Sequence, residues 1–228
     1  MCGIAGIINR DGRPDLAAVT RMQDRLHHRG PDSKGFYVDG ANGRTCLIAN
    51  GEIYNFPALR PQMIADGYAF KTHSDCEVIL PLYERLGSRC VDELRGMFAF
   101  ALWDADRRKL LLGRDRMGEK PLYYACDGRN LVFASELRAI LASGLVSRDL
   151  DPVEISRYFR YQYVPEPRTP FVGIEKVAAG TVIEFDLDTW ELSPSTYWTP
   201  WDADPIEGDP KTLLRGALED AISASLLS

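Results

Sequence analysis

Short apolar segments separated by turn residues fill the middle of the sequence, and this pattern restricts the possible folds most. Runs of this length, bounded by clusters such as Asp104-Ala105-Asp106, predict β-strands, and the last two predict a hairpin. The predicted strands span residues 4–8, 36–38, 45–49, 97–103, 110–113, 122–125, 131–134, 181–187 and 190–197. The central part of the chain is therefore expected to be rich in β-sheet.

Segments with helical periodicity precede and follow this block. The first begins after Pro14 and ends at the cationic run 27–29 before Gly30, which is typical of a helix end. Ser135 is expected to cap another short helix. Further apolar stripes at helical spacing lie at 56–63, 79–86, 137–141, 155–159 and 214–222. Helices, then strands, then helices predict an α+β fold, a sandwich with sheets between helical layers.

The composition is that of an ordinary globular protein. The 228 residues carry a formal net charge of −6 without a lysine- or arginine-rich run, which argues against nucleic acid or an anionic membrane as partner. The longest apolar run, 97–103, is too short to span a bilayer, and no secretory segment follows the start. The cysteines lack metal-ligand spacing and are expected to stay reduced in the cytoplasm. They are Cys2, Cys46, Cys76, Cys90 and Cys126.

The first residues, Met1-Cys2-Gly3, suggest a nucleophile. Initiator methionine is normally removed before a small residue, which would leave Cys2 with a free α-amino group. That group has a pKa of about 7.7–8.0 and is partly neutral near pH 7–8, so it can take a proton from the thiol. Cys2 would then supply both nucleophile and base. The alternative is a small residue that opens a buried strand, because free cysteine is usually buried and inert.

The pair Asn50-Gly51 after a predicted strand has two interpretations. Between apolar runs, Asn-Gly is first of all a hairpin-turn signal. The functional alternative is an oxyanion hole formed by the Asn50 amide and the Gly51 backbone N–H, because glycine lets the backbone approach a reacting group closely. Taken alone, the pair favours the turn.

Ser74-Asp75-Cys76-Glu77 is similarly ambiguous. Ser-x-x-Glu before an apolar periodic run predicts a capping box made by Ser74 and Glu77. A capping box leaves Asp75 unexplained, and an aspartate there could hold the ammonium group of an amino-acid ligand.

Other polar clusters favour structural roles. The helix end accounts for His27 and His28, and His73 is expected in a solvated loop, so no catalytic histidine is predicted. The charged run 114–121 between strands predicts an ion-pair corner or a partner contact.

Taken together, eight stretches form one ordered set. They are Cys2-Gly3-Ile4-Ala5-Gly6, His28-Arg29-Gly30-Pro31-Asp32, residues 50–55, Ser74-Asp75-x-Glu77, residues 96–104, residues 114–124, residues 133–137 and Tyr197-Trp198. In this order they resemble the glutamine-hydrolysing half of asparagine synthetase, a class II, N-terminal-nucleophile glutamine amidotransferase. Other class II amidotransferases share the opening cysteine, whereas the run from Arg114 to Tyr124 is more specific to the asparagine synthetase branch. The resemblance covers essentially the whole chain.

The resemblance implies a four-layer αββα sandwich and assigns roles to matching positions. Cys2 would be the nucleophile, with its own α-amino group as base. Asn50 and Gly51 would form the oxyanion hole, and Glu52 and Asp75 would contact substrate, Asp75 through the α-ammonium group. In the family, the ammonia passes to a second domain, where ATP and Mg²⁺ activate aspartate for conversion to asparagine. No cofactor and no metal ion is expected in the present chain.

The sequence departs from the family pattern before residue 45. Between Gly40 and Asn42 the chain passes almost directly from one predicted strand to the next. The family normally has a further strand and loop there, with an Arg-Leu-Ser-Ile-like stretch whose arginine holds the glutamine α-carboxylate. Arg44 is near in sequence but lies in a different context. An unpaired carboxylate would cost about 2–5 kcal/mol of binding. The family's Lys-x-Pro-Pro-Gly motif is also changed here, to Lys176-Val177-Ala178-Ala179-Gly180.

The end of the sequence suggests a divided organisation. Residues 1–198 are predicted to form the amidotransferase domain, and residues 199–228 a linker and the first helix of a synthetase domain that is missing. The family continues into a Ser-Gly-Gly-x-Asp-Ser pyrophosphate loop, and this sequence contains no Gly-Gly pair.

The leading hypothesis is a cytoplasmic glutaminase domain that uses L-glutamine and supplies ammonia to a synthetase domain, with a homodimer as a candidate assembly. The alternatives are an amidotransferase that feeds another acceptor and a non-catalytic domain that keeps the fold.

Overall fold

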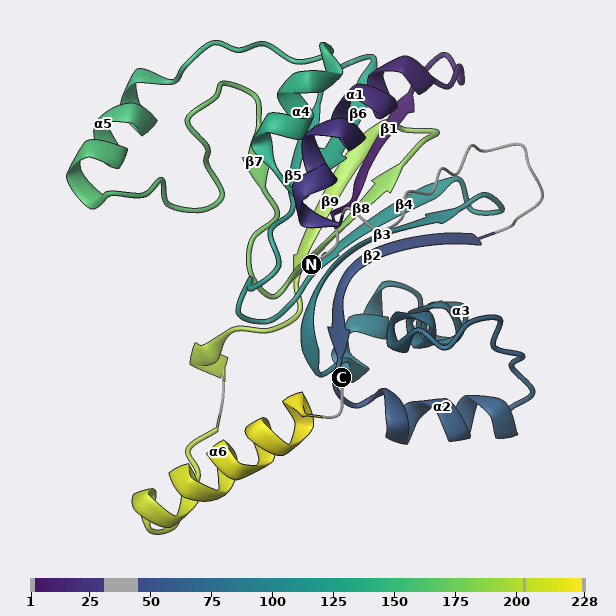
Figure 1. Cartoon of the computed structure of the whole chain (residues 1–228), viewed down its shortest axis with the longest axis vertical. Helices are drawn as coiled ribbons and strands as arrows, with labels where there is room; N and C mark the ends of the chain where they lie inside the picture. Colours follow the sequence, from purple (N-terminus) through teal and green to yellow (C-terminus); the bar gives the residue numbers. More distant parts are fainter. Residues whose placement is uncertain (1–2, 31–44, 203, 227–228) are drawn as a thin grey trace.

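The computed structural model of the chain describes residues 3–30, 45–202 and 204–226. Two antiparallel sheets form its centre (Figure 1). Sheet A has the order β1-β6-β5-β7 and sheet B the order β2-β3-β4-β8-β9. The strands are β1 (Ala5–Asn9), β2 (Thr45–Ile53), β3 (Gly96–Asp104), β4 (Lys109–Arg114), β5 (Tyr123–Cys126), β6 (Asn130–Ala134), β7 (Glu175–Lys176), β8 (Thr181–Asp186) and β9 (Glu191–Thr196).

Helices cover the outer face of each sheet. Helices α1 (Leu16–Leu26) and α4 (Leu137–Ser143) lie on sheet A, whereas α2 (Phe56–Ala65) and α3 (Ile79–Leu86) lie against sheet B (Figure 1). Among the described residues, four short 3₁₀ helices interrupt the loops, namely η1 (His27–Arg29), η2 (Asp75–Val78), η3 (Gly87–Glu93) and η4 (Pro200–Asp202). The order of layers is therefore helix, sheet, sheet, helix, as the resemblance implied.

Three hydrophobic clusters hold these layers together. Met22 and Ile140 pack α1 and α4 onto sheet A. Phe133 and Phe185 meet between the sheets, and Leu82 packs α3 onto sheet B. Alternate residues of the strands enter different clusters, as the period of two in a strand requires.

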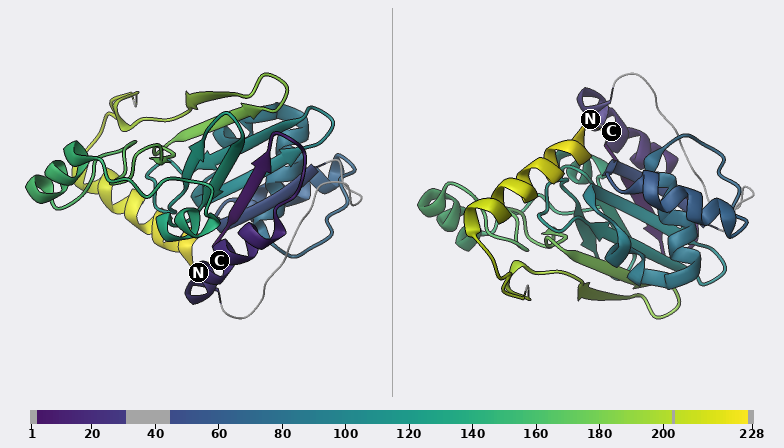
Figure 2. Two further views of the ribbon diagram at one scale, coloured as in Figure 1. Left: turned by 90° about the horizontal axis from the view of Figure 1, so that it is seen from above. Right: turned by 90° about the horizontal axis from the view of Figure 1, so that it is seen from below.

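Helices α5 (Pro152–Tyr161) and α6 (Pro210–Ser225) lie apart from the four layers (Figures 1 and 2). Asp151 caps α5 as Asp-Pro predicts, since its carboxylate accepts the N–H of Val153 at 2.9 Å. The apolar stripe expected on α5 does not face the core. Its residue Phe159 is 79% exposed. No residue of α6 is buried.

The predicted helix and strand positions agree well with the structure where residues are described. The first helix ends in η1, as expected, and the apolar stripes predicted at 56–63 and 79–86 lie on α2 and α3. Residues 181–196 form the predicted hairpin. The predicted strand 36–38 lies outside the described residues.

Candidate active site

Asn50, Gly51 and Glu52 lie within a long strand and not in a turn. They pair with Ala99, Phe98 and Met97 of β3, so β2 continues past the predicted end at residue 49. The prediction of a hairpin turn is therefore wrong. Nine consecutive cross-strand pairs with β3 hold these residues in an extended conformation, which overrides the local turn preference of Asn-Gly.

The backbone of Gly51 points away from β3. Its partner Phe98 bonds to Asp115 instead, since Phe98 O accepts the Asp115 N–H at 2.8 Å and Phe98 N–H donates to the Asp115 carboxylate at 3.2 Å. Gly51 and Phe98 therefore form a non-hydrogen-bonded pair, and the Gly51 N–H faces the outer edge of β2. Among the described residues, no group accepts the Gly51 N–H, so this donor is available to a ligand.

Close packing also explains a glycine at position 51. An added Cβ would lie 2.3 Å from the carbonyl oxygen of Met97 and 2.6 Å from the Cα of Phe98. Any side chain would push β2 away from β3. Glycine is therefore needed for packing here, whether or not its N–H also stabilises an oxyanion.

The Asn50 side chain carries an unused donor. Asn50 is 2% exposed, and its Nδ2 is buried without a hydrogen-bond partner among the described residues. A buried polar group without a partner costs about 1–3 kcal/mol, so native structures rarely keep one without a reason. A donor reserved for a developing negative charge is one such reason.

Asp75 lies against the same edge of β2. It begins η2, and its Oδ2 accepts the N–H of Ile53 at 2.5 Å. The thiol of Cys76 lies 3.8 Å from the Gly51 carbonyl oxygen and donates to it. The fold thus brings the predicted substrate residue Asp75 beside Asn50, Gly51 and Glu52, although 22 residues separate it from Ile53 in sequence.

Glu52 is half-buried beside other acids. Burial and then the carboxylate of Glu52 raise the pKa of Tyr54, with smaller contributions from Glu119 and Asp115. The Glu52 carboxylate therefore lies near Tyr54, and an ammonium group placed beside Glu52 would be favoured by its negative charge.

Glu77 does not form the predicted capping box. Its carboxylate accepts the N–H groups of Lys71 at 2.6 Å and Thr72 at 2.7 Å, and Ser74 makes no side-chain cap. Burial raises the pKa of Glu77, but these bonds, that of the Thr72 hydroxyl and the nearby Arg60 outweigh it and leave the pKa below its ordinary value. Glu77 therefore fixes the loop that leads to Asp75.

Ser135 holds the start of β1 and does not cap a helix. It is fully buried, its Oγ accepts the N–H of Ile4 at 3.0 Å, and its own N–H donates to Ile4 O at 2.9 Å. Ile4 lies two residues from the predicted nucleophile. Sequence reasoning missed this role, because a serine before a helix is normally assigned to capping.

The charged run after β4 is a structural corner, as predicted. The Asp115 carboxylate accepts backbone N–H groups of Met117 at 3.1 Å, Glu119 at 2.9 Å and Lys120 at 3.0 Å. The buried Arg114 guanidinium donates to the carbonyl oxygens of Lys120, Gly118 and Val177 and to the Glu166 carboxylate. Because Asp115 also binds Phe98, this corner supports the strand that backs Gly51.

The histidines have the structural places expected of them. His28 and Arg29 contact the Glu136 carboxylate at 2.8 and 3.0 Å, and His73 is exposed. Cys2 and Arg44 lie outside the described residues, so the structure does not test their predicted places.

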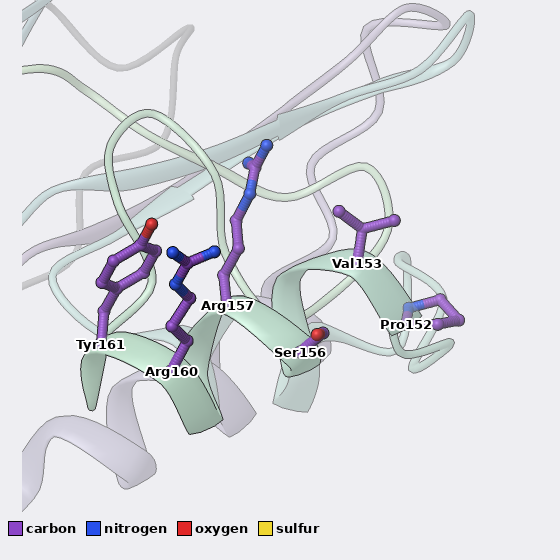
Figure 3. A pocket seen from close by; sticks show the side chains of 6 residues that line it. All are labelled: Pro152, Val153, Ser156, Arg157, Arg160 and Tyr161. Atoms are coloured by element: carbon purple, nitrogen blue, oxygen red, sulfur yellow. The ribbon is translucent and has the colours of Figure 1, made fainter.

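A pocket along α5 is separate from this site. It has a volume of about 400 Å³, and all its lining residues belong to α5 (Figure 3). They are Pro152, Val153, Ser156, Arg157, Arg160 and Tyr161. None of the predicted site residues lines it. Within the described ranges, no group of three or more His, Cys, Asp and Glu residues is suited to a metal ion, and no helix is long and apolar enough to cross a bilayer.

The residues along the β2 edge and the sandwich of two antiparallel sheets can now be compared with known proteins. The chain belongs to the glutamine amidotransferase domain family, which it matches over residues 1–42 and 39–198. The fold is shared with a glutamine phosphoribosylpyrophosphate amidotransferase from B. subtilis, with a TM-score of 0.55, 18% identity and coverage of 87% of this chain and 50% of that one. It is also shared with an allosteric regulatory enzyme of purine biosynthesis, with a TM-score of 0.51, 20% identity and coverage of 73% and 31%. These likenesses confirm the αββα fold.

Relatives found by sequence point to one kind of amidotransferase, and they are much longer than this chain. The chain is 31% identical to asparagine synthetase [glutamine-hydrolyzing] 1 of Bacillus subtilis and 32% identical to asparagine synthetase B of Escherichia coli K12. Each match covers all of this chain but only 40% and 41% of the relative. The chain therefore spans less than half the length of these proteins.

The comparisons also show a discontinuity before β2. The family match consists of two segments that meet at residues 39–42. The alignment with the B. subtilis enzyme has 258 positions against 228 residues in this chain, a difference of 30 positions. The break in the family match falls in the same region, around residues 40–42, where the resemblance predicts a further strand and loop.

Proposed function

We propose that the chain is the glutaminase part of an asparagine synthetase, and that it hydrolyses glutamine to glutamate and ammonia. The single observation that carries this proposal is the edge of β2, where Asn50 keeps an unused Nδ2, Gly51 pairs with Phe98 without a hydrogen bond, and Asp75 accepts the Ile53 N–H. Family membership and the names of the relatives, which are glutamine-hydrolysing enzymes, support glutamine as the amide substrate.

In this proposal Cys2 is the nucleophile. Its α-amino group takes the thiol proton, and the thiolate attacks the side-chain carboxamide carbon of glutamine. Asn50 Nδ2 and Gly51 N–H donate to the oxyanion of the tetrahedral intermediate. The carbon–nitrogen bond then breaks, the protonated amino group returns its proton to the leaving nitrogen, and ammonia leaves a γ-glutamyl thioester. Water hydrolyses the thioester and releases glutamate and the thiol.

Asp75 and Glu52 would hold the amino-acid end of glutamine. The Oδ1 atom of Asp75, which accepts the Ser74 hydroxyl at 3.5 Å, would also accept the α-ammonium group. The arginine that would pair with the α-carboxylate is missing, so we expect glutamine to bind with a raised KM.

The rest of the asparagine synthetase reaction would lie in sequence that this chain does not span. ATP and Mg²⁺ would act there, and the ammonia would be transferred to that domain. Residues 199–228 would then be the linker and first helix of that part, and the protein would work as a cytoplasmic ligase.

A non-catalytic domain is the second candidate, and the break at residues 39–42 favours it. Measuring glutamate and ammonia release from purified protein distinguishes the two. We expect a slow glutaminase activity that Cys2→Ala abolishes without lowering the melting temperature. No activity at saturating glutamine, in a protein that has lost Met1, would support the non-catalytic domain.

A further inference from the structure

Asp115 is a buried carboxylate that binds four main-chain donors. It directly follows β4 and is 1% exposed. Its Oδ2 accepts the N–H groups of Phe98 at 3.2 Å and Lys120 at 3.0 Å. Its Oδ1 accepts those of Met117 at 3.1 Å and Glu119 at 2.9 Å. An ionised carboxylate offers about four acceptor positions, so these four N–H groups use the side chain fully.

The bonds to Phe98 extend the pairing of β3 with β4 by one position. The last paired residue of β4 is Arg114, which lies opposite Ala99. At the next position the Asp115 N–H donates to Phe98 O at 2.8 Å. The Asp115 carbonyl oxygen accepts the Gly180 N–H at 2.8 Å, and the Phe98 N–H donates to the Asp115 carboxylate. The side chain of Asp115 therefore replaces the main-chain acceptor that the end of β4 would otherwise supply.

Phe98 in turn is the residue against which Gly51 packs. The two residues form a non-hydrogen-bonded pair, so contact between their main chains sets the distance from one to the other. A Cβ added to Gly51 would lie 2.6 Å from the Phe98 Cα and 2.8 Å from its Cβ. A displacement of the Phe98 main chain is therefore transmitted to Gly51.

The outer side of Gly51 has a weaker support. Its carbonyl oxygen accepts the Cys76 thiol at 3.8 Å, and a thiol is a weak hydrogen-bond donor. The Gly51 N–H, which is the proposed oxyanion donor, has no acceptor among the described residues. The position of this N–H is therefore determined mainly from the β3 side, where Asp115 holds Phe98.

We propose that Asp115 is a positioning residue for the oxyanion hole, which it holds in place through Phe98 and Gly51. This inference rests on the proposed glutaminase function. The oxyanion forms only after the thiolate has attacked, so a displaced Gly51 N–H should lower kcat and leave KM for glutamine nearly unchanged. A displacement of about 1 Å can lower the rate about 10²-fold.

Glutaminase kinetics of two variants of Asp115 test this proposal, at a temperature at which circular dichroism shows each variant folded. Asp115→Ala removes all four bonds, whereas Asp115→Asn replaces one acceptor oxygen with an NH₂ group and loses two of them. We expect kcat to fall about 10- to 10²-fold in Asp115→Ala and by less in Asp115→Asn, with KM changed less than about twofold. The amide NMR resonance of Gly51 should shift in both variants. If Asp115→Ala does not fold, the same two measurements on Asp115→Asn decide.

Asp104→Asn is the matched control, because Asp104 is a buried carboxylate at the other end of β3. Asp104 is 3% exposed and accepts the Tyr83 hydroxyl and the Arg107 N–H, each at 3.0 Å. The substitution should lower the free energy of unfolding, because it removes a buried acceptor. It should leave kcat, KM and the Gly51 resonance unchanged.

The outcomes separate this inference from the proposed function. In an active protein, an unchanged kcat or an unshifted Gly51 resonance in the folded Asp115 variants overturns the inference and leaves the glutaminase function in place. An equal fall of kcat in Asp104→Asn also overturns it, because a general loosening of β3 would then explain the loss. No activity in the unmodified chain contradicts the proposed function itself, and the inference falls with it.

Discussion

Single polar groups determine what the β2 edge can do. Asn50 and Asn55 illustrate the difference between a reserved and a satisfied amide. Asn50 Nδ2 is buried without a partner among the described residues, whereas Asn55 donates to Glu93 O at 2.8 Å and accepts the Arg95 N–H at 2.9 Å. The first amide is available for chemistry, and the second holds two loops together.

This contrast predicts opposite effects for the same substitution. Asn50→Leu should lower kcat/KM for glutamine by about 10²–10³, because one oxyanion donor is lost. The free energy of unfolding of Asn50→Leu should not fall, because Asn50 Nδ2 makes no hydrogen bond to a described residue that the substitution could remove. Asn55→Leu should lower the free energy of unfolding by about 1–3 kcal/mol and affect kcat far less. Urea unfolding and a glutaminase assay measure both, and a stability loss confined to Asn50→Leu would contradict this assignment.

Local sequence patterns predict the helices and strands well, but they do not predict which partners the polar side chains bind. Helical periodicity and turn clusters located most elements, because those signals act over a few residues. Local rules taken alone favour a turn for Asn50-Gly51, a cap for Ser135 and a capping box for Ser74 and Glu77. Their actual partners, β3, Ile4 and the loop at 71–72, arise from tertiary packing that local rules do not contain. The resemblance predicts roles for Asn50, Gly51, Glu52 and Asp75, and these roles stay predictions. The spacing of these residues in the sequence does not show that η2 brings Asp75 to β2.

The loop before η2 should make part of the stability depend on pH. The pKa of Glu77 is lowered in the folded state, so its contribution is fully present above the ordinary carboxyl pKa of about 4.5. That contribution is lost as the pH falls through the lower folded-state value. Glu77→Gln should therefore lower the free energy of unfolding at pH 7 and reduce its fall below pH 4.5.

Urea unfolding from pH 7 to pH 3 measures this dependence. Glu84→Gln on the exposed side of α3 is the control and should leave the pH profile unchanged. An unchanged acid limb in Glu77→Gln would show that other carboxyl groups determine it.

At the scale of the whole molecule, the four layers form one unit and α6 adds nothing to their core. All three hydrophobic clusters are made by residues before 199, and α6 exposes Leu214, Leu218 and Ile222. In the described residues, α6 therefore carries an apolar stripe that the four layers do not cover.

Residues 1–198 alone should fold with a melting temperature within about 2 °C of the 228-residue chain. A shorter form ending at residue 190 also loses β9 and should be much less stable, because β8 is then an uncovered edge. Differential scanning calorimetry compares the three forms. A large loss on removing 199–228 would mean that α6 packs on the domain in solution.

The proposed function depends most on an N-terminal cysteine in a pocket that recognises glutamine. Measuring the intact mass of the protein before and after incubation with 6-diazo-5-oxo-norleucine, a glutamine-like alkylator, tests both properties most directly. Burial raises the pKa of the Cys46 thiol to about 11. Burial and then the nearby Asp92 raise the pKa of the Cys90 thiol to about 12, against a smaller lowering by backbone hydrogen bonds. These two thiols should therefore not react at pH 8. We predict loss of Met1 and one adduct, mapped to Cys2. A retained Met1, or a trimmed protein without an adduct, would contradict the claim.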